Sequence, residues 1–160
     1  MSRPDYEPEL SLKREQYLEL LELLSPLPTR TLVRTDYYYD SPDRWFRSRQ
    51  IALCVRESGG RLTGIVRRPG PTGQGCRVTD FPVTALPPAL LLHGRPAWLV
   101  GSLQTRRTIF ALTDAILIQL DENRWLGTRN YALKINCPRH ALPTARGVLL
   151  LLQRLLALPG

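Results

Sequence analysis

Short segments of extended-chain composition, separated by turn residues, run through most of the sequence and constrain its fold more than any other feature. Gly59 and Gly60 separate two such segments at a spacing typical of a β-hairpin. Because short turns rather than long crossovers join most of them, we expect an α+β protein with an antiparallel β-barrel or a strongly curved sheet. The expected strands are 7–13, 31–40, 51–58, 61–68, 76–84, 104–112, 115–127 and 131–138.

Two segments near the ends of the chain have helical patterns. Residues 14–24 repeat apolar side chains at helical spacing, and Pro26 and Pro28 follow at once. Residues 144–158 are apolar on nearly every side, which predicts a helix buried against the sheet or against a second subunit, as in a homodimer. The segment 89–103 is expected to be a short helix and loop. At 160 residues the chain fits a single domain, 1–160.

The charge balance is the unusual part of the composition. The formal net charge is +8, and Lys13 and Lys134 are the only lysines, so arginine supplies most of the positive charge. A basic balance favours phosphate-bearing partners. No stretch is long and apolar enough to predict a membrane span, and the three cysteines lack paired spacing. We therefore expect a cytoplasmic protein with reduced thiols and no membrane partner.

The first expected strand carries polar side chains at every second position. Glu7, Glu9, Ser11 and Lys13 would share one face, because successive side chains of a strand alternate between faces. Such a face needs water or a ligand.

Basic residues recur at single positions in the later strands, beside small or polar alternation partners. In a barrel these side chains would line a common cavity, where their mutual repulsion favours a bound anion. Arginine suits phosphate because its planar fork meets two oxygens at once. The basic positions are Arg56, Arg67, Arg77, Arg107 and Lys134.

The order and spacing of several short motifs resemble the CYTH domain, also called the triphosphate tunnel metalloenzyme family. The motifs are ELSLK, YYYDSPD, IALCVR, GIVRRPG, GSLQTRR, LDENRWLG and NYALKI. The resemblance implies an antiparallel tunnel that holds a linear triphosphate, with basic residues on the phosphates and carboxylates on Mg²⁺ or Mn²⁺. Members hydrolyse inorganic triphosphate, thiamine triphosphate or RNA 5′-triphosphate ends, and some are adenylyl cyclases.

The resemblance also assigns roles to residues of this chain. The ExExK signature falls on Glu9, Ser11 and Lys13, so Lys13 and Glu9 become the catalytic candidates. Metal ions would be carried by Glu7, Glu9 and Asp121. The phosphate-binding set implied by the resemblance is Lys13, Arg56, Arg67, Arg77 and Arg107.

Four positions depart from the family pattern. Ser11, Thr79, Ala132 and Lys134 stand where the family has acidic residues. Because Mg²⁺ prefers oxygen ligands and phosphoryl transfer depends on the metal, these losses predict weakened or absent hydrolysis with phosphate binding retained. If the chain is active, it is a divalent-metal-dependent triphosphatase that acts on triphosphate or polyphosphate.

Two alternatives of another class stay open. The outer arginines could form a non-catalytic module for RNA or polyphosphate, with Trp45, Trp98 or Trp125 as stacking surfaces. The tunnel could also be vestigial and the chain a scaffold.

Overall fold

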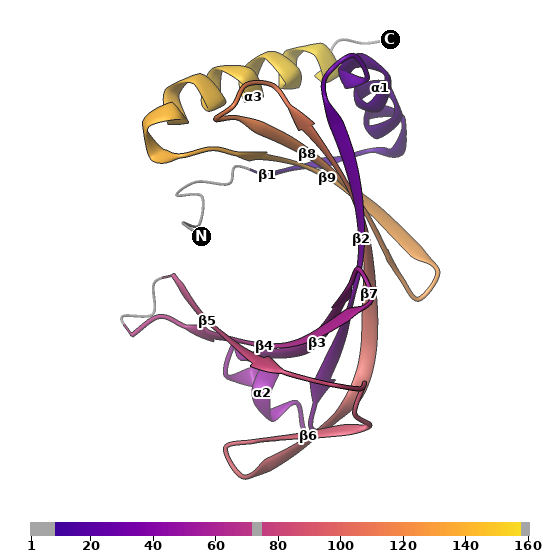
Figure 1. The fold of residues 1–160 in the computed structure, drawn as a ribbon, viewed down its shortest axis with the longest axis vertical. Coiled ribbons are helices and arrows are strands. Elements are labelled where there is room, and N and C mark those ends of the chain that lie inside the picture. Colours follow the sequence, from indigo (N-terminus) through magenta and orange to yellow (C-terminus); the bar gives the residue numbers. More distant parts are fainter. Residues whose placement is uncertain (1–8, 72–74, 158–160) are drawn as a thin grey trace. The chain divides into compact units, whose positions relative to one another are not determined.

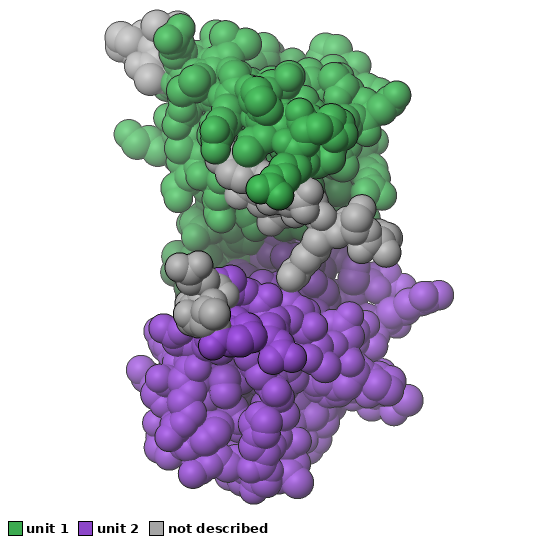
Figure 2. Space-filling view, turned by 90° about the vertical axis from the view of Figure 1, so that its left-hand side faces the viewer, with its two compact units in different colours: residues 1–32, 106–160 green, residues 33–105 purple. Residues whose placement is uncertain are grey.

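The computed structural model describes residues 9–71 and 75–157. The chain divides into two compact units, which we describe separately (Figure 2): unit 1 comprises residues 1–32 and 106–160, and unit 2 comprises residues 33–105. The elements in chain order are β1 (Glu9–Leu12), α1 (Arg14–Leu24), β2 (Thr29–Asp40), α2 (Trp45–Ser48), β3 (Ala52–Ser58), β4 (Arg61–Pro69), β5 (Cys76–Pro82), β6 (Ala89–Leu92), β7 (Arg95–Ala111), β8 (Leu117–Trp125), β9 (Thr128–Asn136), a 3₁₀ turn (Arg139–Ala141) and α3 (Leu142–Ala157).

The expected antiparallel α+β architecture is confirmed. The strand order is β1-β9-β8-β7-β2-β3-β4-β5, with β6 paired to β7 (Figure 1). This order is linear and begins at β1 and ends at β5, so the term barrel fits the described residues only approximately. The predicted hairpin at Gly59 and Gly60 joins β3 to β4, and both glycines have positive φ, which costs glycine little.

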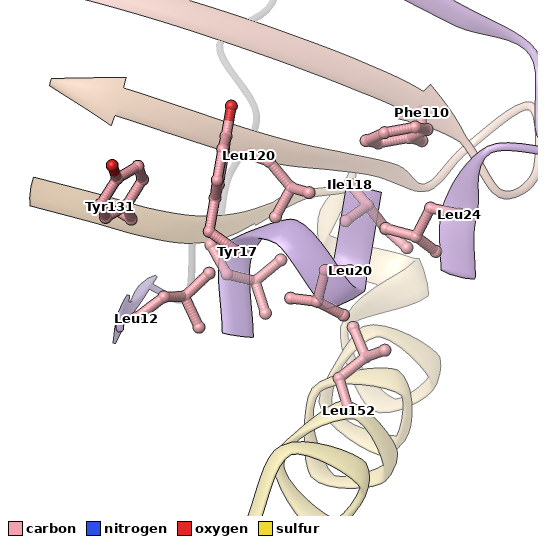
Figure 3. Close-up of a cluster of buried hydrophobic side chains, with 10 residues drawn as sticks. Leu12, Tyr17, Leu20, Leu24, Phe110, Ile118, Leu120, Tyr131 and Leu152 are labelled. Atoms are coloured by element: carbon pink, nitrogen blue, oxygen red, sulfur yellow. The ribbon is translucent and has the colours of Figure 1, made fainter. Parts of the chain in front are cut away.

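In unit 1, α1 and α3 lie on the same side of β8 and β9 (Figure 1). Tyr17 and Leu20 of α1, Ile118 and Leu120 of β8 and Leu152 of α3 form part of one buried cluster (Figure 3). The cluster takes alternate residues of each strand, since period-two alternation places them on one face. The remaining residues of these strands face away from the helices.

In unit 2, alternate residues of β2, β3 and β4 meet the short helix α2. Tyr39, Phe46, Leu53, Val55 and Val66 form this second core. Asp40 fixes the entry to α2, because its carboxylate accepts backbone N–H bonds from Ser41, Phe46 and Arg47.

One expectation about local structure is wrong. Residues 89–103 form β6 and the first part of β7 instead of helix and loop, with a tight turn in which His93 and Gly94 both have positive φ. The leucine run at 90–92 hid the strand, because a short apolar run does not distinguish strand from helix. The helix expected at 144–158 is α3: Leu152 is buried in the unit 1 core, whereas Leu150, Leu151 and Leu155 are exposed.

Candidate functional site

Unit 1 presents a polar sheet face on the side away from its helices. Gln119 and Asp121 of β8 alternate with the core residues Ile118 and Leu120. The β8–β9 register places Lys134 directly across from Gln119, and Ala132 across from Asp121. The β1–β9 register adds Glu9 across from Lys134 and Ser11 across from Ala132. We call Glu9, Ser11, Arg107, Gln119, Asp121, Ala132 and Lys134 the unit 1 polar face.

A buried carboxylate organises this face. Asp121 is 1% exposed and accepts two hydrogen bonds from the Arg107 guanidinium, from Nε to Oδ1 at 2.8 Å and from Nη2 to Oδ2 at 2.9 Å. The ammonium of Lys134 lies 3.8 Å from Oδ2 of the same carboxylate. Two cations therefore compensate one buried anion, and the fork geometry fixes the Arg107 side chain.

Unit 2 repeats the arrangement on its own polar face. Asp36 of β2 is 3% exposed and accepts hydrogen bonds from Nε and Nη2 of Arg56 at 2.7 and 3.1 Å. Asp36 pairs directly with Arg56 in the β2–β3 register, and Tyr38 pairs with Cys54. The hydrogen bonds that Arg56 donates to Asp36 raise the pKa of Arg56 above its usual value. Asp36, Tyr38, Cys54, Arg56 and Arg67 form the unit 2 polar face.

Burial raises the pKa of two side chains on this face, Cys54 and Tyr38. It is the main cause that raises the pKa of the Cys54 thiol, and the Asp36 carboxylate adds to the effect. The same two causes, in the same order, raise the pKa of Tyr38. Both groups are therefore neutral at pH 7, and the charges of the face come from Asp36 and the arginines.

The strand register places some predicted phosphate ligands on one face of the unit 2 sheet and another on the opposite face. Arg67 lies across from Ala52, on the same face as Cys54 and Arg56. Arg77 pairs with Arg68 and so lies on the opposite face of the sheet, and it is exposed. Alternation places Arg77 and Thr79 on one face of β5. Which face of the sheet this is depends on the register of β5 with β4.

The sequence matches one known protein family. A family model for the CYTH domain matches residues 3–156, which includes nearly all of both units. The chain belongs to the CYTH family. A search of curated protein sequences found no significant match.

Solved structures share the CYTH fold at low sequence identity. A proposed adenylate cyclase from Bacillus halodurans has a TM-score of 0.72 at 16% identity and covers 94% of this chain and 90% of its own. The Hippeastrum protein HpAC1, described with a dominant triphosphatase activity, has a TM-score of 0.74 at 16% identity, covering 96% and 88%. The Pct1 RNA triphosphatase of S. pombe has a TM-score of 0.51 at 13% identity, covering 93% and 71%. At these identities the likeness establishes the fold.

The carboxylates that the CYTH resemblance assigns to a metal ion do not form a ready metal site. Glu7 lies outside the described residues. Glu9 is exposed and stands across from Lys134, and both oxygens of Asp121 already accept hydrogen bonds from Arg107. Within residues 9–71 and 75–157, no group of three or more His, Cys, Asp or Glu side chains gathers in a metal-binding arrangement. The described members of the donor set, Glu9 and Asp121, therefore do not fit Mg²⁺ or Mn²⁺ as they stand.

The other catalytic candidate, Lys13, lies at the end of β1 where α1 begins. Its side chain is exposed, and its backbone N–H donates to Oε1 of Gln16 at 2.8 Å. Three of the four positions where acidic residues are replaced, Ser11, Ala132 and Lys134, are neighbours on the unit 1 polar face. The fourth, Thr79, pairs with Val66 and lies on the opposite face of the unit 2 sheet from Arg67.

Sequence reasoning missed Asp36 and Gln119. Asp36 shares one face of its strand with Arg34 and Tyr38. A charged residue in such a strand either faces solvent or pairs with a buried partner. Which partner it finds depends on the β2–β3 register. Gln119 is 4% exposed, and its Oε1 has no hydrogen-bond partner among the described residues.

Proposed function

We propose that this chain binds triphosphate or polyphosphate anions through the basic residues of its polar faces, with metal-dependent hydrolysis weakened or lost. The observation that carries the proposal is the pair of buried aspartates that orient Arg56 and Arg107 by bidentate hydrogen bonds. An arginine held in this way loses little side-chain freedom when it binds phosphate. Arg67 and Lys13 add further positive charge.

Membership of the CYTH family supports the ligand class, and HpAC1 and Pct1 are described as triphosphatases. The loss of acidic positions around Asp121 supports the weakened chemistry, because water activation and charge neutralisation depend on a well-held metal ion.

The first experiment is thermal unfolding with tripolyphosphate, followed by calorimetric titration of Arg67→Ala, Arg77→Ala and Arg47→Ala. A ligand at about 100 times its Kd stabilises by about 2.7 kcal/mol. Arg67→Ala is expected to weaken binding about ten- to a hundredfold, since a hydrogen bond to a charged group contributes about 1.5–3 kcal/mol. Arg47 is an exposed residue of α2, and α2 packs through Phe46 on the sheet face opposite the unit 2 polar face, so Arg47→Ala is the matched control.

Arg77→Ala decides between the two assignments of that residue. The family resemblance gives Arg77 a phosphate contact, whereas the register places it across the sheet from Arg67. We expect Arg77→Ala to behave like the control. The Arg56→Ala, Arg67→Ala double variant should abolish binding, and unaltered affinity in that variant would refute the proposed function.

One observation bears on the RNA-binding alternative. The guanidinium groups of Arg49 and Arg95 lie 4.0 and 4.3 Å from the centre of the Trp45 ring, so this ring is already stacked. Trp98 is 46% exposed and remains available for a base.

We also propose a homodimer through the exposed leucines of α3, Leu150, Leu151 and Leu155. Light scattering at high micromolar concentration tests it, and the Leu150→Glu, Leu151→Glu variant should shift the mass to that of a monomer.

No helix within the described residues is long and apolar enough to cross a membrane.

A further inference from the structure

Lys134 has an oxygen-bearing residue as its register partner on each neighbouring strand. It lies in β9 with Glu9 across on one neighbouring strand and Gln119 across on the other. Its ammonium is 3.8 Å from Oδ2 of Asp121, and its side chain is 23% exposed. Carboxylate and amide oxygens are the ligands that hard cations prefer, and they are equally the acceptors that an ammonium group needs.

The occupancy of Asp121 makes this position unfavourable for a second cation. Arg107 donates one hydrogen bond to each oxygen of Asp121, so a divalent ion would have to displace the guanidinium or share an oxygen with it. Such an ion would also approach the positive charge of Lys134, and like charges in a poorly solvated site repel strongly.

Gln119 supplies a second buried oxygen acceptor on this face. Its amide oxygen is fully buried and accepts no hydrogen bond from the described residues, although buried polar atoms are nearly always satisfied. The residue directly across the β8–β9 register is Lys134, which has three donors and no acceptor. Lys134 does not donate to this oxygen in the structure, so of the acceptors on this face Asp121 is the one that meets the chain's own cation.

We propose that the ammonium group of Lys134 takes the place of a divalent metal ion on the unit 1 polar face, so that the protein binds its phosphate ligand without metal. The ligand named here rests on the proposed function, whereas the exclusion of the metal rests on Lys134, Arg107 and Asp121 alone. A single substitution at Lys134 should then restore a metal site.

The test is a Mn²⁺ titration of the protein alone, followed by electron paramagnetic resonance of the free ion. Lys134→Glu exchanges the ammonium for a third carboxylate beside Glu9 and Asp121, and ligand charge tunes metal affinity, so we expect Mn²⁺ to bind at least about tenfold more tightly than to wild type. Arg154→Glu makes the same change of charge on an exposed residue of α3 and should leave Mn²⁺ binding at the wild-type level. Adding Asp121→Asn to Lys134→Glu should remove the gain.

Two results would overturn the inference. One is stoichiometric Mn²⁺ binding by the wild type that Asp121→Asn abolishes. The other is a Lys134→Glu variant that keeps the wild-type circular dichroism spectrum and gains no Mn²⁺ affinity. If Lys134→Glu does not fold, the wild-type titration still decides. No phosphate is present in these titrations, so failure to bind tripolyphosphate would refute the proposed function without touching this result.

Discussion

Asp36 and Asp121 are each almost fully buried, and each meets an arginine that is itself partly exposed. Burying a carboxylate is unfavourable unless a charge and good hydrogen bonds compensate it, and here both oxygens of each carboxylate are engaged. The aspartates therefore hold the side chains of Arg56 and Arg107 in place.

Replacing Asp36 by Asn should lower the free energy of unfolding by about 2–4 kcal/mol, because Arg56 loses its charged partner in a half-buried setting. Urea unfolding at neutral pH measures this loss. Asp80→Asn removes the same charge from an exposed position of β5 and should change stability by less than about 0.5 kcal/mol. Equal effects in the two variants would show that the Asp36–Arg56 pair contributes nothing specific.

Cysteine reactivity should follow burial. Cys54 and Cys137 are buried, and burial raises the pKa of both thiols, whereas Cys76 is exposed. A disulfide reagent such as Ellman's should modify Cys76 quickly and the other two only on unfolding. If all three thiols react at one rate in the folded protein, the burial of Cys54 and Cys137 is contradicted.

The same raised pKa gives a pH dependence of stability. The fold favours the neutral Cys54 thiol, so its contribution is complete below the unfolded pKa of about 8.5 and is lost as pH rises toward the folded value. Urea unfolding at pH 7 and at about pH 10 should therefore show a smaller alkaline loss of stability for Cys54→Ala than for wild type. An identical loss in both proteins would contradict this linkage.

At the scale of single elements, periodicity predicted which residues share a face better than it predicted which strands meet. Arg56 with Cys54, and Lys134 with Ala132, lie on one face as alternation requires. The pairing of Asp36 with Arg56 could not be derived, because it depends on register between strands whose separation in the sequence leaves several alignments open. A positive φ at His93 also has no sequence signature as strong as that of a glycine pair.

A close contact between β4 and β5 gives an element-scale prediction. A Cβ added at Gly64 would lie 2.1 Å from the Phe81 ring, which covers this glycine across the strand pair. Gly64→Ala should cost about 1–3 kcal/mol of stability by overpacking. Gly101→Ala places its Cβ in open space and is the control. Adding Phe81→Leu to Gly64→Ala should recover part of the loss, and no recovery would show that the ring is not the cause.

At the scale of the whole molecule, the family match extends across both compact units, which agrees with the expectation of one domain without testing it. The family was predictable from the order and spacing of the short motifs, and the CYTH family model matches residues 3–156. The ligand chemistry was less predictable. It depends on whether Asp121 is free or held by Arg107 and Lys134, and that follows from tertiary contacts alone.

The net charge of +8 attracts every polyanion, so affinity alone cannot separate the proposed function from RNA binding. The salt dependence can, because each phosphate contact with single-stranded RNA contributes about −0.7 to the slope of log K against log salt. If a few oriented arginines bind a short ligand, tripolyphosphate should bind more tightly than a long single-stranded RNA, and Arg67→Ala should weaken only tripolyphosphate. Fluorescence anisotropy for RNA and calorimetry for tripolyphosphate, each across a salt series, provide the comparison. Tighter binding of RNA with a steep slope and no effect of Arg67→Ala would instead assign the charge to an outer nucleic-acid surface.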